Sequence, residues 1–175
     1  MPFPSSAPDR TDSPRDRGRG YLRQRPVRLL LRGNRALEGT MHLAEGQSLI
    51  GFLDSRKAFL NLTEVHWLDG RGGGSSLPHL AIRISQIVWV VPQDPSLALS
   101  SAVIPTQQSR EVELELVGDV GIRVRLNIAD EQRMSDYLDS NPSFVPLRSA
   151  RVRETQEVME RIAVNHTAIL TVRET

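Results

Sequence analysis

A segment from the first half of the chain recurs in the second half. Residues 27–62 align with residues 112–147 without a gap, and eleven of the 36 aligned pairs are identical. Differences at apolar positions are mostly conservative, as in the pair Leu37 and Ile122. Self-similarity of this kind is the signature of a repeated structural unit. The chain is therefore expected to be a tandem duplication of one small domain.

The alignment resumes after a shift of five residues, which pairs Ile82 with Ile162 and Trp89 with Ile169. Each unit then contains about 65 residues, near the lower size at which a domain folds alone. We expect the two units to support each other.

Within a unit the hydrophobic period is mostly two, which predicts β-strands. Apolar and polar residues alternate over residues 27–32, and a similar alternation follows the turn after this segment. The turn itself contains Gly33 and Asn34, and the second unit has Gly118 and Asp119 there. These residue types accept positive φ angles, so a β-hairpin is expected in each unit.

The next segment, residues 47–54, spaces its apolar residues as a short helix does, and residues 132–139 repeat the spacing. Three further apolar or alternating segments read as strands: residues 59–68, 80–85 and 87–91. The predicted fold class is mainly β, with two small barrel-like or sandwich-like β-β-α-β-β-β domains behind an extended amino-terminal arm. Pro146 lies in a predicted strand, so that position should be an edge or a bulge.

Four segments are predicted: an arm over residues 1–26, a first β-domain over 27–92, a linker over 93–109 and a second β-domain over 110–175. Counted from the sequence, their net charges are +3, +2, −1 and −3. The arm is rich in Arg and Pro and poor in apolar residues, so it is expected to stay disordered until a partner binds it.

The candidate partner-binding residues are the arginines of the arm, its tyrosine and the outward arginines of the first predicted strand. Such a segment binds anionic lipid headgroups, nucleic acid or the acidic surface of another protein subunit. The acidic second domain and the scarcity of aromatic residues disfavour nucleic acid. A spacer without a binding role is the alternative. The set is Arg10, Arg15, Arg17, Arg19, Tyr21, Arg23, Arg25, Arg28 and Arg32.

Charge differs between the two units at matched positions. Arg28 corresponds to Glu113, and Arg32 is expected on the same face as Glu115. Either the units attract each other across a pseudo-twofold interface, or each faces a different neighbour. Both alternatives suit a protein that bridges other subunits.

No motif predicts catalysis, a cofactor or a metal ion. None of the four histidines has a ligand-like partner two or four residues after it, and G-x-S-x-G, Walker and dinucleotide-binding motifs are absent. The chain has no cysteine, which excludes disulfides and thiolate zinc sites. The repeated pair Asp54-Ser55 and Asp139-Ser140 is interpreted as a helix-end turn whose side-chain oxygens accept hydrogen bonds from backbone amides.

Location and role follow from these exclusions. The sequence has no apolar run of about 20 residues, the length needed to cross a bilayer as a helix. It also has no apolar segment of the kind found in signal peptides. We therefore expect a cytoplasmic, non-catalytic structural or adaptor subunit, peripheral on the inner face of a membrane. It would contact other protein subunits of a larger complex through its arm and its exposed strand edges.

One motif resembles the pattern of PilZ domains, which bind cyclic di-GMP. Arg15-x-x-x-Arg19 or Arg19-x-x-x-Arg23 is followed by Asn34-x-Ala36-x-x-Gly39. In PilZ domains the second motif follows a later strand, whereas here Asn34 falls in the first predicted hairpin turn. The resemblance implies an alternative function as a nucleotide-binding or nucleic-acid-binding module.

The overall form also resembles the membrane-extrinsic accessory subunits of bacterial photosynthetic reaction-centre/light-harvesting complexes. An Arg-rich arm precedes duplicated β-domains, and 21 of the 22 basic residues are Arg. No pigment-ligand signature is present in the sequence. The resemblance implies mechanical support between pigment-bearing subunits.

Overall fold

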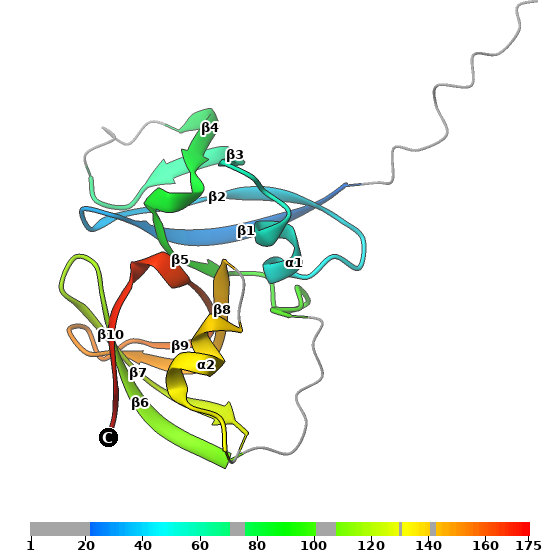
Figure 1. Ribbon diagram of the computed structural model, residues 1–175. Coiled ribbons are helices and arrows are strands. Elements are labelled where there is room, and N and C mark those ends of the chain that lie inside the picture. Colours follow the sequence, from blue (N-terminus) through cyan, green and yellow to red (C-terminus); the bar gives the residue numbers. More distant parts are fainter. Residues whose placement is uncertain (1–21, 71–75, 101–107, 130, 141–142) are drawn as a thin grey trace, which may run out of the picture.

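A computed structural model of the chain describes residues 22–70, 76–100, 108–129, 131–140 and 143–175 (Figure 1). Within these ranges lie ten β-strands, two short α-helices and two one-turn 3-10 helices, so the predicted mainly-β class is confirmed. The first half contains β1 (Leu22–Leu31), β2 (Arg35–Ala44), α1 (Leu49–Asp54), β3 (Phe59–Trp67), β4 (Leu77–Arg83), η2 (Ile84–Gln86) and β5 (Ile87–Pro92). The second contains β6 (Gln108–Leu116), β7 (Val120–Ile128), α2 (Met134–Asp139), β8 (Phe144–Val152), β9 (Val158–Asn165), η3 (His166–Ala168) and β10 (Ile169–Glu174).

All ten strands form one antiparallel sheet in the order β10-β6-β7-β8-β9-β5-β1-β2-β3-β4. The first half follows the path β5-β1-β2-β3-β4, and the second follows β10-β6-β7-β8-β9. The halves meet where β5 pairs with β9, with Trp89 opposite Val164 and Val90 opposite Ala163. In place of two separate β-domains, one continuous sheet therefore spans both halves. Because the strands that meet have different positions within their halves, the junction is head to tail and is not the pseudo-twofold interface that was one of the two alternatives.

Both predicted hairpin turns are present. Gly33 and Asn34 have φ angles of 77° and 56°, and Gly118 and Asp119 have φ angles of 86° and 58°. Only glycine and a few polar residues such as Asn and Asp adopt this left-handed region readily. These four residues therefore place β2 beside β1 and β7 beside β6.

The strand pairings correct the alignment of the last two strands of each half. Leu29 faces Val90 across β1 and β5, and Leu114 faces Val172 across β6 and β10. The matched partners Val90 and Val172 thus lie 172 − 90 = 82 positions apart. Relative to the spacing between residues 27 and 112, this is a shift of three residues and not the predicted five. A slip of two residues keeps the alternation of a strand intact, so apolar patterning alone did not detect it.

Two predicted boundaries also change. Residues 22–26, expected as the end of the arm, belong to β1, where Leu22 lies opposite Ala44 of β2. In the predicted linker over residues 93–109, Leu97 and Leu99 are buried. Residues 93–100 thus pack on the first half, whereas Gln108 and Ser109 belong to β6.

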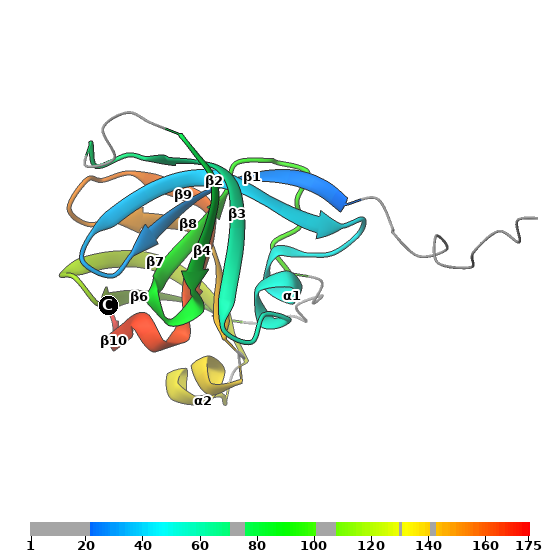
Figure 2. The ribbon, with the colours of Figure 1, turned by 90° about the horizontal axis from the view of Figure 1, so that it is seen from above.

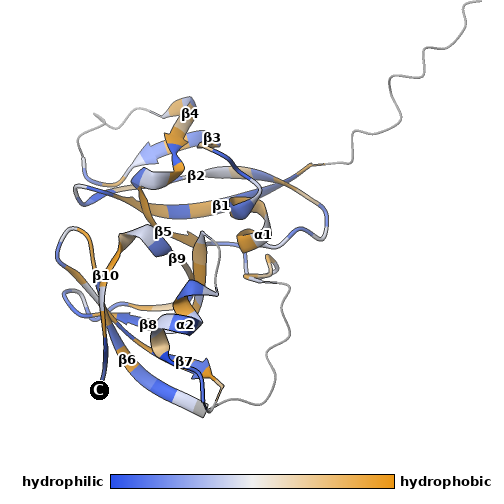
Figure 3. Ribbon diagram, viewed as in Figure 1, coloured by the Kyte–Doolittle hydropathy of each residue, from blue (hydrophilic) through white to orange (hydrophobic). Residues whose placement is uncertain are grey.

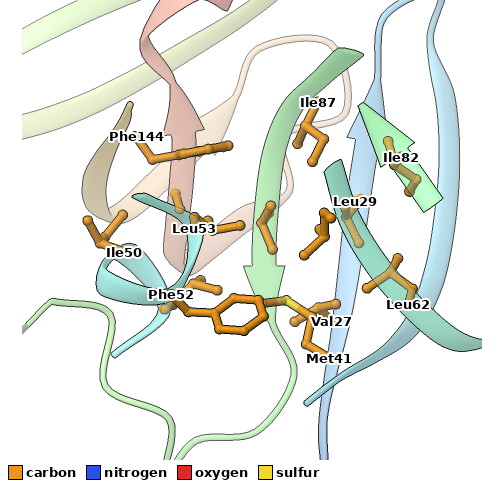
Figure 4. Packing of buried hydrophobic residues seen from close by; sticks show 14 of the residues in the cluster. Val27, Leu29, Met41, Ile50, Phe52, Leu53, Leu62, Ile82, Ile87 and Phe144 are labelled. Atoms are coloured by element: carbon orange, nitrogen blue, oxygen red, sulfur yellow. The ribbon is translucent and has the colours of Figure 1, made fainter. Parts of the chain in front are cut away.

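Two clusters of buried apolar side chains form the core, one in each half, and each receives residues from the other. The cluster of the first half includes Phe144, which comes from β8 (Figure 4). The cluster of the second half includes Leu30 from β1 and Trp89 from β5. Because side chains cross the junction in both directions, the halves are interlocked as well as paired.

The two short helices lie at matching places between the second and third strands of their halves (Figure 2). In α1 the hydroxyl of Ser48 accepts a hydrogen bond from the amide of Gly51, and Phe52 and Leu53 are buried. An N-cap of this kind stabilises a helix by about 0.5 to 2 kcal/mol. In α2 the matching position is Arg133, which makes no capping bond, and only Leu138 is buried.

Candidate functional site

The junction between the halves is held by side chains from β9 as well as by strand pairing. Arg161 donates hydrogen bonds to the carbonyl oxygens of Asp94 at 2.7 Å, Pro95 at 3.1 Å and Leu97 at 2.5 Å. The amide group of Asn165 donates to the carbonyl oxygen of Ile84 at 3.0 Å. The Arg161 hydrogen bonds fix the segment that leaves β5 against the second half. The Asn165 hydrogen bond holds the turn that precedes β5.

Two arginines predicted to bind a partner connect the halves within the molecule. Arg28 forms an ion pair with Glu157, which precedes β9. Arg32 donates to the carbonyl oxygens of Ser85 at 2.8 Å and of Thr167 at 2.9 Å. Both arginines therefore contact other residues of the same chain.

Arg23 and Arg25 lie near the beginning of β1. Arg23 is exposed and pairs with Glu45 at 3.0 Å. Arg25 pairs with Asp94 and donates to the hydroxyl of Ser96 at 2.8 Å. Hydrogen bonds from Ser96 and then from Arg25 lower the pKa of Asp94 to about 2. The remaining candidates lie outside the described residues: Arg10, Arg15, Arg17, Arg19 and Tyr21.

Glu113, which matches Arg28, and Glu115, which matches Leu30, belong to a charged cluster on the outer face of the second half. Arg153 and Arg173 both donate to the carboxylate of Glu113, at 3.2 Å and 2.5 Å, and Arg153 also pairs with Glu115. The Glu113 side chain is only 7% exposed. Its hydrogen bond with Arg173 is the main cause that lowers its pKa. We call these four residues the charged cluster; Figure 3 shows hydrophilic colouring along β6, where two of them lie.

Gly121 makes room for this charged cluster. A Cβ atom at Gly121 would lie 2.7 Å from Cζ of Arg153. The backbone of β7 is thus close enough for the guanidinium group to cross it and reach β6. Arg28 thus pairs with Glu157 of the other half, whereas Glu113 pairs with Arg153 and Arg173 of its own half.

His42 and the repeated Asp-Ser pair have partners within the chain. His42 lies 2.9 Å from the hydroxyl of Thr63. The hydroxyl groups of Ser55 and Ser140 donate to backbone carbonyl oxygens at 2.6 Å and 2.7 Å, so they cap helix ends through carbonyls and not through the predicted amides. Asp54 does accept from a backbone amide, that of Ser143 in the other half, and burial raises its pKa.

Among the residues with described positions, no group of three His, Asp or Glu side chains could hold a metal ion.

The residues of the PilZ-like motif that fall within the described ranges also have local contacts. The Asn34 side chain donates to the carbonyl oxygen of Gly118 at 3.1 Å. Ala36 packs against the cluster of the second half. A Cβ atom at Gly39 would approach the Val65 side chain to 3.2 Å. These contacts lie at the junction and in the sheet.

The outermost strands of the sheet are β4 and β10, and each has one side without a neighbour in the described sheet. On β10, Leu170 is 62% exposed. On β4, Ala81 is exposed and Leu80 is half-buried, and both line a pocket of about 470 Å³ with Leu22 and Phe52. A second pocket, of about 400 Å³, lies at the junction and includes Lys57 and other polar residues.

Sequence reasoning missed the residues that join the halves. Trp89 is 7% exposed, and its neighbours in β5 are all buried. The signal was present, because residues 87–91 form an apolar run without alternation, which is typical of a strand buried on both faces. In β10, the strand that corresponds to β5, this apolar run is interrupted by the polar residues Thr171 and Arg173.

None of the helices in the described ranges has the length and apolar character needed to cross a membrane. No family model, curated protein or solved structure matches the chain. The functional conclusions below therefore depend on the geometry of this molecule.

Proposed function

We propose that this protein is a non-catalytic structural or adaptor subunit that docks on a larger assembly through a strand edge. The observation that carries the proposal is the outer edge of β4, which has no neighbouring strand among the described residues and where Leu80 and Ala81 border a pocket. An edge strand offers free backbone amides and carbonyls, and pairing with a segment of another chain satisfies them.

The proposed scaffold is a duplicated β-domain. Its two copies follow the same strand path, and matched residues such as Leu29 and Leu114 are buried in both. The ion pair of Arg28 with Glu157 and the paired β5 and β9 keep the copies in a fixed relation. A rigid body of this kind holds the β4 edge in a fixed orientation relative to the second half.

The proposed location is the cytoplasmic face of a membrane complex, such as a photosynthetic reaction-centre/light-harvesting complex. There the Arg-rich residues 1–21 would contact anionic headgroups or an acidic protein surface. This location rests on composition and on the overall form of the chain.

Co-sedimentation with washed membranes of the source organism tests the docking role. The full chain and a variant without residues 1–21 are compared, because β1 begins at Leu22 and a longer deletion would remove strand residues. We expect the full chain to sediment with an identifiable membrane complex and the shortened chain to sediment less at low salt, where the attraction of the Arg-rich segment to anionic groups is least screened. Recovery of both as free monomers would contradict the proposal.

A second candidate function is the binding of a nucleotide, and the junction pocket of about 400 Å³ favours it. Lys57, Arg83 and His166 line this pocket together with Ser85 and Thr167. Cationic groups and hydroxyls are suited to phosphate oxygens. Cyclic di-GMP is the probe that the PilZ-like motif suggests. Saturable, salt-sensitive binding that Arg83→Ala weakens would support this function, and binding that the variant leaves unchanged would contradict it.

A further inference from the structure

The junction provides an internal template for what the free edges of the sheet can bind. Within their halves, β4 occupies the place of β9 and β10 occupies the place of β5. Since β5 and β9 pair with each other, the residues of that pair can be compared one by one with those of the two free edges.

At the β10 edge the apolar residues of the template are replaced by polar ones. Leu30 and Trp89, which enter the core of the second half, correspond to Glu115 and Thr171. Val91 corresponds to Arg173, which pairs with Glu113. An apolar strand placed here would strip water from the charged cluster, and uncompensated burial of charge is unfavourable. Charged side chains of this kind also block pairing at natural sheet edges.

At the β4 edge the template is retained. Ile82 faces Leu60 as Val164 faces Val145, so Ala81 and Ile82 match Ala163 and Val164, the two residues that pair with β5. Neither residue is charged, and Pro78, which lacks an amide, lies three positions before Ala81.

No segment of the described ranges covers the outer face beside β4, whereas its counterpart is covered. On the outer face of β9, Arg161 holds the segment that follows β5. The matching face of β4 carries the pocket of about 470 Å³, whose lining includes Phe52, Leu80 and Ala81. Residues opposite each other in antiparallel strands point to the same side. A side chain opposite Ala81 would therefore lie on the pocket side of the sheet.

We propose that β4 is the docking edge and that it accepts an extended segment of another protein, antiparallel to β4, with bulky apolar residues opposite Ala81 and Ile82. The inference rests on the proposed docking role and names its surface. The partner is a different protein and not a second copy of this chain, because β10, the one described strand with the matching place, carries Thr171 and Arg173 where an apolar strand is required.

The test uses a labelled synthetic peptide with the sequence of residues 84–95, which contains β5, as the probe. The full chain is titrated with it and compared with Ala81→Lys and with the matched control Ala44→Lys, which alters an exposed alanine of β2. We expect saturable binding that Ala81→Lys weakens at least tenfold and Ala44→Lys leaves unchanged. Absence of binding, or equal binding by the two variants, would overturn the inference.

A second experiment gives β10 the residues of the template. The triple variant Glu115→Leu, Thr171→Trp, Arg173→Val is expected to self-associate in light scattering, and added Ala81→Lys is expected to abolish the association. Wild-type chains that already associate through β10 would overturn the assignment of a different protein as partner. A negative peptide titration beside positive membrane co-sedimentation would show that the chain docks through another surface, so the two proposals fail separately.

Discussion

Trp89 of β5 lies directly opposite Val164 of β9, and this pair belongs to the hydrophobic cluster of the second half. An aromatic side chain from one half thus fills the core of the other. Because the backbone pairing and the side-chain packing coincide here, neither half has a complete core without its neighbour.

The first prediction concerns this tryptophan. Trp89→Ala should lower the free energy of unfolding by about 3 to 5 kcal/mol, the usual cost of removing a large buried aromatic side chain. Thr171→Ala, at the matched and exposed position of β10, should change it by less than about 0.5 kcal/mol. Urea unfolding followed by circular dichroism measures both values. Equal effects of the two substitutions would contradict the role assigned to the junction.

Local chemistry in the sequence was sufficient for the turns and for the order of elements. Gly33 and Gly118 stood where only a few residue types fit, and their φ angles are positive as predicted. The pairing of β5 with β9 was not predictable in the same way. The apolar run around Trp89 indicates burial on both faces, but periodicity contains no information about which strand covers the second face.

The charged residues show the same limit. The difference between Arg28 and Glu113 was visible in the sequence, yet their partners Glu157 and Arg173 come from segments far away in the chain. The choice between a symmetric interface and two different neighbours depended on the relative placement of the halves. Long-range placement of this kind requires coordinates, because a single sequence contains no pairwise contact signal.

The second prediction concerns Arg161, which donates to three carbonyl oxygens of the segment after β5. Arg161→Lys keeps the charge but loses the planar group that reaches several acceptors at once. Hydrogen bonds to charged groups contribute about 1.5 to 3 kcal/mol, so we expect a loss of about 1 to 2 kcal/mol. Arg148→Lys is the control, because Arg148 is exposed opposite Arg161 on β8. Hydrogen exchange of the Leu49 and Ile50 amides, which bond to this segment, should accelerate only in Arg161→Lys.

The third prediction compares two glycines in matching turns. Gly118 and Gly33 both have positive φ, but a Cβ atom at Gly118 would collide with Oδ1 of Asn34, whereas one at Gly33 meets nothing within 4 Å. Gly33→Ala should therefore cost only the backbone strain, about 1 kcal/mol, and Gly118→Ala should cost more. Chemical denaturation of both variants measures the difference. If the collision is the cause, Asn34→Ala should reduce the additional cost of Gly118→Ala, and an unchanged cost would argue against it.

The last prediction concerns pH and Asp94. Hydrogen bonds from Ser96 and Arg25 lower the pKa of Asp94 from its ordinary value of 3.8 to about 2 in the folded chain. Because the folded state holds the carboxylate ionised more strongly than the unfolded state does, Asp94 stabilises the fold above pH 4. That contribution is lost as the pH falls from about 4 to about 2. Asp94→Asn should therefore be less stable than wild type at pH 6, and the two unfolding curves should converge toward pH 2. Asp119→Asn, which removes an exposed carboxylate from the β6-β7 turn, controls for the change in net charge. The free energies of unfolding of Asp94→Asn and wild type could instead differ by the same amount from pH 6 to pH 2. That result would show that the ionised carboxylate does not stabilise the beginning of β1 against the segment after β5.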